Sequence, residues 1–135
     1  MAEGKVAFEL VSPERLLLSA EVDMIVVPGS EGDFGVLPRH SPLISTVRPG
    51  VINVHDNGQV TERIFVAGGF AEVTPERCTV LAERAVALAE VDRAEVEAEL
   101  KSAREELTDA TNDDERAAAQ RQILVAEALL QAASH

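Results

Sequence analysis

The hydrophobic pattern of this chain changes its period near residue 87, and that change most constrains the fold. Before it, apolar runs are short, rich in Val and Ile, and alternate with polar residues, as in half-buried strands. All eight glycines and all six prolines lie before residue 76. After residue 87 there is no Gly or Pro, and Ala, Glu and Leu dominate, which is typical of helices. We therefore expect a β domain over residues 1–87 and a helical domain over residues 88–135.

The first half contains strand signals separated by turn signals. Val6, Phe8 and Leu10 alternate with more polar residues and share one face of a predicted strand. Asn57-Gly58 lies between two further strand patterns, and Asn-Gly predicts a hairpin because both central residues of a type I′ turn have positive φ. Another strand pair surrounds the turn sequence TPER. Turn signals about every ten residues indicate a small antiparallel β-sandwich or barrel.

The second half carries two helical stripes joined by a turn. Asp92, with Glu95 three residues later, resembles a capping box at the start of the first helix. Residues 111–114 suit a turn and a new N-cap, and a second helix follows to about residue 133. The stripes are Val96, Leu100, Ala103, Leu107 and Ala110, then Ala119, Ile123, Ala126, Leu130 and Ala133. We therefore predict an antiparallel helical hairpin, and a fold class of α+β by segregation in which an antiparallel β-sandwich comes first.

The charge and aromatic content exclude several kinds of partner. Asp and Glu outnumber Lys and Arg by 24 to 12, which gives a net charge of −12. Trp and Tyr are absent and Phe occurs four times, so few side chains could stack on bases. A nucleic acid or an anionic lipid surface would need clustered cations. We expect neither as a ligand, whereas a basic protein partner is compatible with this charge.

The start of the chain and the length of its apolar runs predict a cytoplasmic chain, and its cysteine is expected to be buried. The start, MAEGKVAFEL, has no cationic region followed by an apolar run, so we expect no secretory signal. No apolar stretch approaches the roughly 20 residues of a spanning helix, so any membrane association would go through a partner. Cys78 is the one cysteine, so no intramolecular disulfide is expected, and its setting in RCTVLA predicts a small buried side chain.

Residues 28–43, PGSEGDFGVLPRHSPL, combine three glycines, two carboxylates and a histidine. A phosphate-binding P-loop would need a Lys followed by Ser or Thr, and this stretch has no Lys. A dinucleotide fingerprint would need a helix that begins at the loop, and Pro38 and Pro42 prevent one. We therefore exclude both kinds of nucleotide-binding loop here.

The same stretch gives little support to catalysis or to metal binding. Asp33, His40 and Ser41 have the residue types of a hydrolase triad, but no oxyanion donor is evident and so short a segment rarely adopts that geometry. The three histidines of the chain lie far apart, without the spacing of metal ligands. Glu31 and Asp33 could form a solvated acidic tip, with the glycines as turn residues. A long loop stiffened by three prolines also suits contact with another protein.

The order of three motifs resembles one protein family. PGSEGDFGVLPRHSPL is followed by RPGVI at residues 48–52 and by VAGGFAEV at residues 66–73, and an Ala-rich helical hairpin comes last. This arrangement covers nearly the whole chain and is similar to the epsilon subunit of bacterial F-type ATP synthases, whose mitochondrial counterpart is called delta. The resemblance implies a flattened β-sandwich followed by a helical hairpin.

The resemblance also implies a non-catalytic subunit of the central stalk. In that family the sandwich binds the gamma subunit and rests on the rotor ring of c subunits, which couples proton flow to ATP synthesis. The chain would then lie on the cytoplasmic face of the bacterial inner membrane, held peripherally by the complex. By position, the resemblance implies that Glu31, Gly32, Asp33 and His40 would face gamma and the ring, with Glu31 opposite the arginines of the ring loops.

Regulation by the hairpin is a further implication of the resemblance. In many bacteria the hairpin extends toward the alpha/beta catalytic head and restrains ATP hydrolysis, partly through basic residues. Residues 88–135 here carry 12 acidic and 5 basic side chains, so we expect weak inhibition. The family's nucleotide motif matches AEVDRA at Arg93 and Ala94, whereas Ala89 and Glu90 depart from it. Glu90 and Arg93 are the candidates for weak regulatory ATP binding, and a purely structural helix start is the alternative.

Two other functions stay open from the sequence. A stand-alone adaptor or chaperone would have the same sandwich and hairpin, and recovery of gamma in a pull-down would separate it from a stalk subunit. A small hydrolase that uses Asp33 and His40 would show activity in the purified chain. We expect no catalysis, no metal and no tightly bound cofactor.

Overall fold

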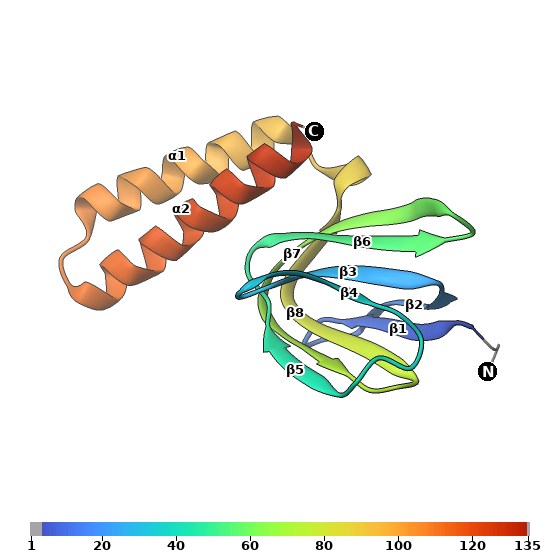
Figure 1. Ribbon diagram of the computed structural model, residues 1–135. Helices are drawn as coiled ribbons and strands as arrows, with labels where there is room; N and C mark the ends of the chain where they lie inside the picture. The colour runs from blue at the N-terminus through green and yellow to red at the C-terminus, as the bar shows by residue number, and fades with distance from the viewer. Residues whose placement is uncertain (1–3, 135) are drawn as a thin grey trace. The chain divides into compact units, whose positions relative to one another are not determined.

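The computed structural model describes residues 4–134, which form a strand-rich half followed by a helical half (Figure 1). By their contacts, the residues divide into two compact units between Ala87 and Leu88. The predicted α+β class with segregated halves is confirmed. The elements are β1 (Val6–Val11), β2 (Leu16–Val22), β3 (Met24–Gly29), β4 (Gly32–Val36), β5 (Leu43–Thr46), β6 (Gly50–Asp56), β7 (Gln59–Val73), β8 (Arg77–Ala87), the 3-10 helix η1 (Leu88–Glu90), α1 (Arg93–Asp109) and α2 (Asp113–Ala133).

The strands form one hydrogen-bonded sheet that folds over itself around a shared core. The strand order is β2-β1-β8-β7-β6-β3-β4, and β5 pairs with β7 outside this path. The first part of β7 pairs with β6 and its last residues pair with β5, so β7 joins the two layers. Apolar side chains from both layers form one cluster, in which Phe8, Ile52 and Val80 have no exposed surface. The predicted sandwich is thus confirmed.

One strand pair departs from the predicted antiparallel arrangement. β1 pairs with β8 in parallel, with Phe8 opposite Cys78 and Leu10 opposite Val80. The other strand pairs within residues 4–134 are antiparallel. Parallel strands cannot be joined by a tight turn, and here β2 to β7 together form the connection. The alternation in β1 shows which side chains are buried but not which strand lies beside it, so the sequence carries no signal for this pairing.

Two glycines bend β7 where it exchanges β6 for β5 as its partner. Gly68 and Gly69 have φ of +75° and +102°, in the region that favours glycine. A Cβ on Gly69 would lie 1.8 Å from the carbonyl oxygen of Leu81, so no larger residue fits. The pairing of β7 with β8 omits Gly68 and Glu83 but keeps the same register on both sides, so the ladder is interrupted there without an extra residue in either strand. Core-facing positions change parity along β7 across this bend, from Val66 before it to Ala71 after it.

The predicted turns of the sandwich are confirmed. Asn57 and Gly58 have φ of +53° and +75° and join β6 to β7, as a type I′ turn requires. Between β7 and β8, the backbone N–H of Thr74 donates to the carbonyl of Arg77 at 2.8 Å. Both turns depend on residues next to each other in the sequence, which is why the sequence predicts them.

Cys78 lies in the core of the sandwich, as predicted. Its side chain has no exposed surface. Burial raises the pKa of its thiol to about 12, so the group stays protonated and behaves as a small apolar residue.

The helices α1 and α2 lie side by side and antiparallel (Figure 1). Asp92 is the N-cap of α1, because its carboxylate accepts hydrogen bonds from the backbone N–H groups of Ala94 at 3.0 Å and Glu95 at 3.3 Å. Asn112 caps α2 by accepting from the N–H of Glu115 at 2.8 Å. Among residues 4–134, no helix is both long and apolar enough to cross a membrane.

The buried stripes of the two helices follow the predicted positions with one shift. Val96, Leu100 and Ala103 are buried in α1, and Ala119 and Ala126 are buried in α2. Leu129 rather than the predicted Leu130 is the buried leucine near the end of α2. A step of three and a step of four from Ala126 reach opposite sides of the same stripe, so helical spacing alone does not choose between the two leucines.

Candidate functional site

The segment predicted to be one long loop, residues 28–43, contains a tight β-hairpin and a separate connection (Figure 1). β3 and β4 pair up to Gly29 and Gly32, so only Ser30 and Glu31 form the turn. Gly32 has a φ of +135°, and a Cβ on Gly29 would lie 2.8 Å from the phenylalanine ring of β4. The prediction of a long loop was wrong, because glycines that suit a loop also allow a strand to turn back at once.

Glu31 occupies the tip of this β3–β4 hairpin. Its side chain is exposed, and no hydrogen bond or ion pair engages it within residues 4–134. Gly32 beside it is exposed as well and adds no side chain that could shield the carboxylate. Glu31 is therefore free to form a charge-assisted contact with a cationic group on another molecule.

Asp33, two residues further along, is engaged within the chain. Its carboxylate accepts a hydrogen bond from Nη2 of Arg48 at 2.5 Å. Nη1 of Arg48 donates to the carbonyl of Gly29 at 2.6 Å, and the backbone N–H of Arg48 donates to the carbonyl of Pro28 at 2.9 Å. Sequence reasoning used Arg48 only as part of the RPGVI motif and did not pair it with Asp33, because 15 residues separate the two.

His40 lies half-buried on the connection between β4 and β5. Its backbone N–H donates to the carbonyl of Leu37 at 3.2 Å, and its ring Nδ1 lies 2.6 Å from the carbonyl oxygen of Ser41. Because a carbonyl can only accept, Nδ1 carries a proton and donates it to Ser41. Arg39 has a φ of +66° and donates its backbone N–H to the carbonyl of Pro75 at 2.8 Å, which anchors the connection to the β7–β8 turn.

The structure does not assemble the triad that Asp33 and His40 could form. Asp33 is bound by Arg48, and the Nδ1–H of His40, which would donate to the carboxylate in a triad, is used by a backbone carbonyl. Within the described residues, no group of three or more His, Cys, Asp and Glu side chains is placed to hold a metal ion.

The two candidates for ATP binding lie where the helical unit begins. Glu90 ends η1 and is exposed, and Arg93 is the first residue of α1. Nη1 of Arg93 donates to Oγ of Ser134 at 2.9 Å, and Nη2 lies 3.7 Å from the carboxylate of Glu97. Arg93 thus ties the start of α1 to the end of α2, and a nucleotide would compete with these contacts.

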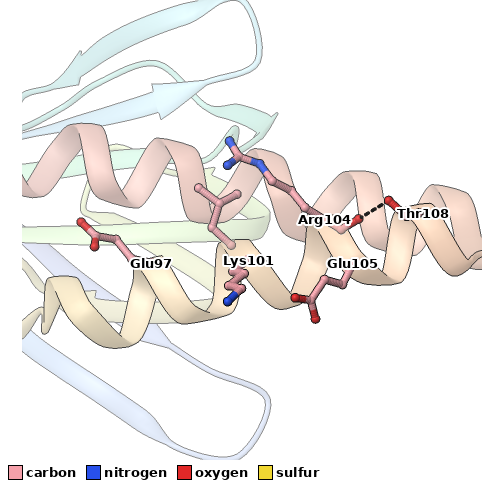
Figure 2. Close-up of a pocket in the computed structure, with 6 residues that line it drawn as sticks. Glu97, Lys101, Arg104, Glu105 and Thr108 are labelled. Atoms are coloured by element: carbon pink, nitrogen blue, oxygen red, sulfur yellow. Dashed lines mark hydrogen bonds between the residues drawn. The ribbon is translucent and has the colours of Figure 1, made fainter.

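An open pocket of about 350 Å³ lies along α1, where Figure 2 shows its side chains. It is lined by Glu97, Leu100, Lys101, Arg104, Glu105 and Thr108. Arg104 forms an ion pair at 3.4 Å with Glu127 of α2. Neither ATP candidate lines this pocket, and the lining carries charges of both signs. We therefore assign no ligand to it.

An ionic cluster lies at the opposite end of β3 from Glu31. Nζ of Lys5 is 2.8 Å from Asp23 and 2.5 Å from Asp56. The hydrogen bond from Lys5, joined by one from the backbone N–H of Asn57, lowers the pKa of Asp23. The same carboxylates raise the pKa of Lys5, with the hydrogen bond to Asp23 first. This cluster joins β1 to two turns, so its role is structural.

Two family models match the chain, in the same order as its two units. The beta-sandwich domain of ATP synthase delta/epsilon chains matches residues 5–88, and the C-terminal domain of ATP synthase epsilon chains matches residues 92–135. The chain belongs to the ATP synthase epsilon family. The resemblance inferred from the glycine-rich segment and the two later motifs is thereby confirmed.

Relatives in the epsilon family match almost end to end. The ATP synthase epsilon chain of Paramagnetospirillum magneticum is 58% identical over 129 residues, which cover 96% of each chain. That of Rhodospirillum rubrum is 58% identical over 125 residues, or 93% of each chain. That of Parvibaculum lavamentivorans is 55% identical over 119 residues, which cover 88% of this chain and 89% of the relative.

Solved structures with this fold come from ATP synthases of two other organisms. A chain of the Euglena gracilis mitochondrial ATP synthase (OSCP/F1/c-ring) aligns with a TM-score of 0.81 and 24% identity, over 100% of this chain and 84% of that one. A chain of the Tetrahymena thermophila mitochondrial ATP synthase (central stalk/c-ring) aligns with a TM-score of 0.67 and 15% identity, over 98% and 99%. At these identities the matches show that the epsilon-family chain shares their fold.

Proposed function

We propose that this epsilon-family chain is a non-catalytic central-stalk subunit of a proton-translocating F-type ATP synthase. It binds gamma and the rotor ring of c subunits, and so couples proton flow to ATP synthesis. The observation that carries the proposal is the match of both family models in order, together with 58% identity to an epsilon chain over 96% of each chain. The complex holds the chain peripherally at the cytoplasmic face of the bacterial inner membrane.

The contact surface of the proposal is the β3–β4 hairpin together with the connection that follows it. Glu31 and Gly32 are exposed at the tip, and Glu31 has no partner within the described residues. The backbone N–H of His40 bonds the carbonyl of Leu37, and its ring Nδ1 bonds the carbonyl of Ser41, which orients the ring for contact with a neighbouring subunit. A rigid tip with one available carboxylate suits a cationic loop of the ring.

Binding to gamma is the direct test of this function. The full chain, immobilised through a C-terminal tag, should recover purified gamma. A synthase reconstituted without the chain should lose the coupling of proton flow to ATP synthesis. The variant Leu37→Ser on the connection should keep the fold, because that side chain is 55% exposed. Its recovery of gamma then tests whether the connection belongs to the contact surface. A chain that ignores gamma, or that turns over a substrate unaided, would overturn the proposal.

Regulation of hydrolysis by the helical hairpin is weak in this proposal. Residues 88–135 carry 12 acidic and 5 basic side chains, and like charges oppose a close approach to an acidic segment of the catalytic head. Removal of residues 88–135 from the subunit in a reconstituted head with gamma should raise hydrolysis only slightly. A many-fold rise would contradict this part of the proposal.

ATP binding through Glu90 and Arg93 is also weak in this proposal. A nucleotide phosphate would have to replace Ser134 and Glu97 as partners of the Arg93 guanidinium. Equilibrium dialysis of the full chain with ATP, beside an Arg93→Ala variant, measures the interaction. Tight binding that the variant loses would show that these contacts yield readily to a nucleotide.

A stand-alone adaptor or chaperone has no observation in its favour. Such a protein needs a sandwich and a hairpin but not the epsilon-chain sequence, and both family models match in order.

A further inference from the structure

Arg48 makes three contacts with the base of the hairpin that carries Glu31. Its guanidinium donates to the carbonyl of Gly29 and to the carboxylate of Asp33, and its backbone N–H donates to the carbonyl of Pro28. The two guanidinium bonds use different nitrogens, so the planar fork joins the end of β3 to the start of β4. One side chain thus spans both strands of the hairpin beside its turn.

The segment around Arg48 packs across the same hairpin. The backbone N–H of Ser30 donates to the carbonyl of Thr46 at 3.1 Å, and Gly29 forms an isolated antiparallel bridge with Val47. A Cβ on Gly50 would lie 2.9 Å from the Cβ of Pro28, so the two backbones approach closely. These contacts hold the turn in one place before any partner binds.

The ion pair also changes the charge that the tip presents. Asp33 and Arg48 have side chains that are 59% and 43% exposed, and they neutralise each other. Glu31 has no cation beside it within the described residues. An approaching partner therefore meets one uncompensated carboxylate on this hairpin instead of two.

We infer that Arg48 is a positioning residue, which clamps the β3–β4 hairpin so that Glu31 alone meets a cationic group of the rotor assembly. Asp33 then acts through Arg48 and does not contact the partner. The inference rests on the proposed function and deepens it, because it divides the acidic tip into one recognition residue and one clamp residue.

The clamp predicts non-additive variants in the complete synthase. ATP-driven proton pumping per ATP hydrolysed is measured in inverted membrane vesicles for Glu31→Gln, Arg48→Ala, Asp33→Ala and the two double variants that contain Glu31→Gln. Each single variant should lower the ratio by about threefold, the range of an exposed ionic contact. The double variants should be no worse than Glu31→Gln alone, because the clamp acts only through Glu31. Arg63→Ala, which removes a surface cation that bonds Asn53, should pump normally.

A second measurement tests, in the purified full chain, whether Arg48 holds the hairpin turn in place. Amide hydrogen exchange at residues 30–32 should be at least about tenfold faster in Arg48→Ala than in the parent chain. Arg48→Lys keeps the charge but has no planar fork, so its exchange should lie between the two. Melting temperatures within about 3 °C of the parent would show that the sandwich is intact, since the pair is exposed.

The outcomes separate the clamp from the proposed function. Unchanged exchange in Arg48→Ala, or a double variant that pumps clearly less than Glu31→Gln, would overturn the clamp. Normal pumping by Arg48→Ala beside defective pumping by Glu31→Gln would overturn the clamp alone. Normal pumping by Glu31→Gln would overturn the tip contact and the clamp's role in it, whereas failure to bind gamma would overturn the proposed function itself.

Discussion

The β-sandwich and the helical hairpin bury their apolar side chains in different ways. The sandwich core collects residues from β1, β2, β3, β4, β6, β7 and β8, among them Phe8 and Ile25. The hairpin buries three alanines beside Val96, Leu100 and Leu129. A fully buried Val, Ile, Leu or Phe side chain contributes about 1.5–3 kcal/mol, and an alanine methyl much less. The hairpin thus depends more on caps and helix propensity, and the sandwich on contacts between distant segments.

That difference teaches where each unit is vulnerable. A strand such as β7 pairs with three others, β5, β6 and β8, so a distortion of its backbone disturbs several strand pairs at once. The backbone hydrogen bonds of a helix lie within the helix itself, so a distortion at its end disturbs the hydrogen bonds of one turn only. The sandwich carries the proposed contact at Glu31, and the hairpin carries the proposed regulation.

Gly69→Ala should cause the largest loss. Its Cβ would lie 1.8 Å from the Leu81 carbonyl oxygen at a φ of +102°, and we expect a loss of about 3 kcal/mol or more in the free energy of unfolding. Gly58→Ala is the matched control, because it has a φ of +75° and open space around it, and should cost about 1 kcal/mol. Urea titration measures both. Equal losses would show that the crowded bend in β7 has no special role.

The difference in the free energy of amide opening between the two units should be smaller, and hydrogen exchange measures it. Amides of α1 and α2 should open with a free energy about 2 kcal/mol below that of central sandwich amides, because the hairpin buries small side chains. The amides of Leu100 and Val80 make a direct comparison, since both residues are buried. Equal protection at the two positions would contradict the difference in anchoring.

Loss of a helix cap should affect the hairpin alone. Asp92→Ala removes the acceptor of two backbone N–H groups and should destabilise α1 by about 1 kcal/mol. Asp92→Asn keeps an acceptor oxygen and should stay close to the parent. Exchange at residues 93–96, followed beside exchange in β8, measures the effect. A cap variant that also loosened β8 would show that the two units open together.

Acid should weaken each unit through one carboxylate, with the smallest effects. Lys5 and the Asn57 N–H lower the pKa of Asp23 below its ordinary 3.8, and the hydroxyl and N–H of Thr111 lower that of Glu115 below 4.5. Both contributions are present above these ordinary values and are lost as the pH falls through the lowered pKa. Asp23→Asn should flatten the acid response of the sandwich, and Glu115→Gln that of the hairpin. Melting temperatures and exchange measured from neutral to acid pH test this assignment.

The raised pKa of Lys5 makes the stability of the sandwich fall at high pH, the opposite of the acid effect. Its contribution is complete below the ordinary value of 10.5 and is lost as the pH rises through the raised pKa. Lys5→Met should therefore remove the alkaline dependence that this cluster gives to the sandwich, and should reduce the acid dependence without removing it, because the Asn57 N–H still donates to Asp23. An alkaline transition that persists in the variant would point to another group.

The candidate site was partly predictable. Glu31, Gly32 and His40 stood out in the sequence because their segment is rich in glycine, proline and charge. The pairing of Asp33 with Arg48 was not, because 15 residues separate them and either could have faced solvent. The tight turn at residues 30–31 was also missed, since the contact of Gly29 with the β4 phenylalanine is visible only in the folded hairpin.

The sequence alone determined the order of the two units, the turn at Asn57-Gly58, the cap at Asp92 and the epsilon family, because each of these depends on neighbouring residues or on an ordered set of motifs. Only the tertiary structure decided the parallel pairing of β1 with β8, the bend at Gly69 and the bond from Arg48 to Asp33. Those features join distant segments, and a pattern of alternation or charge specifies a face without specifying what lies against it.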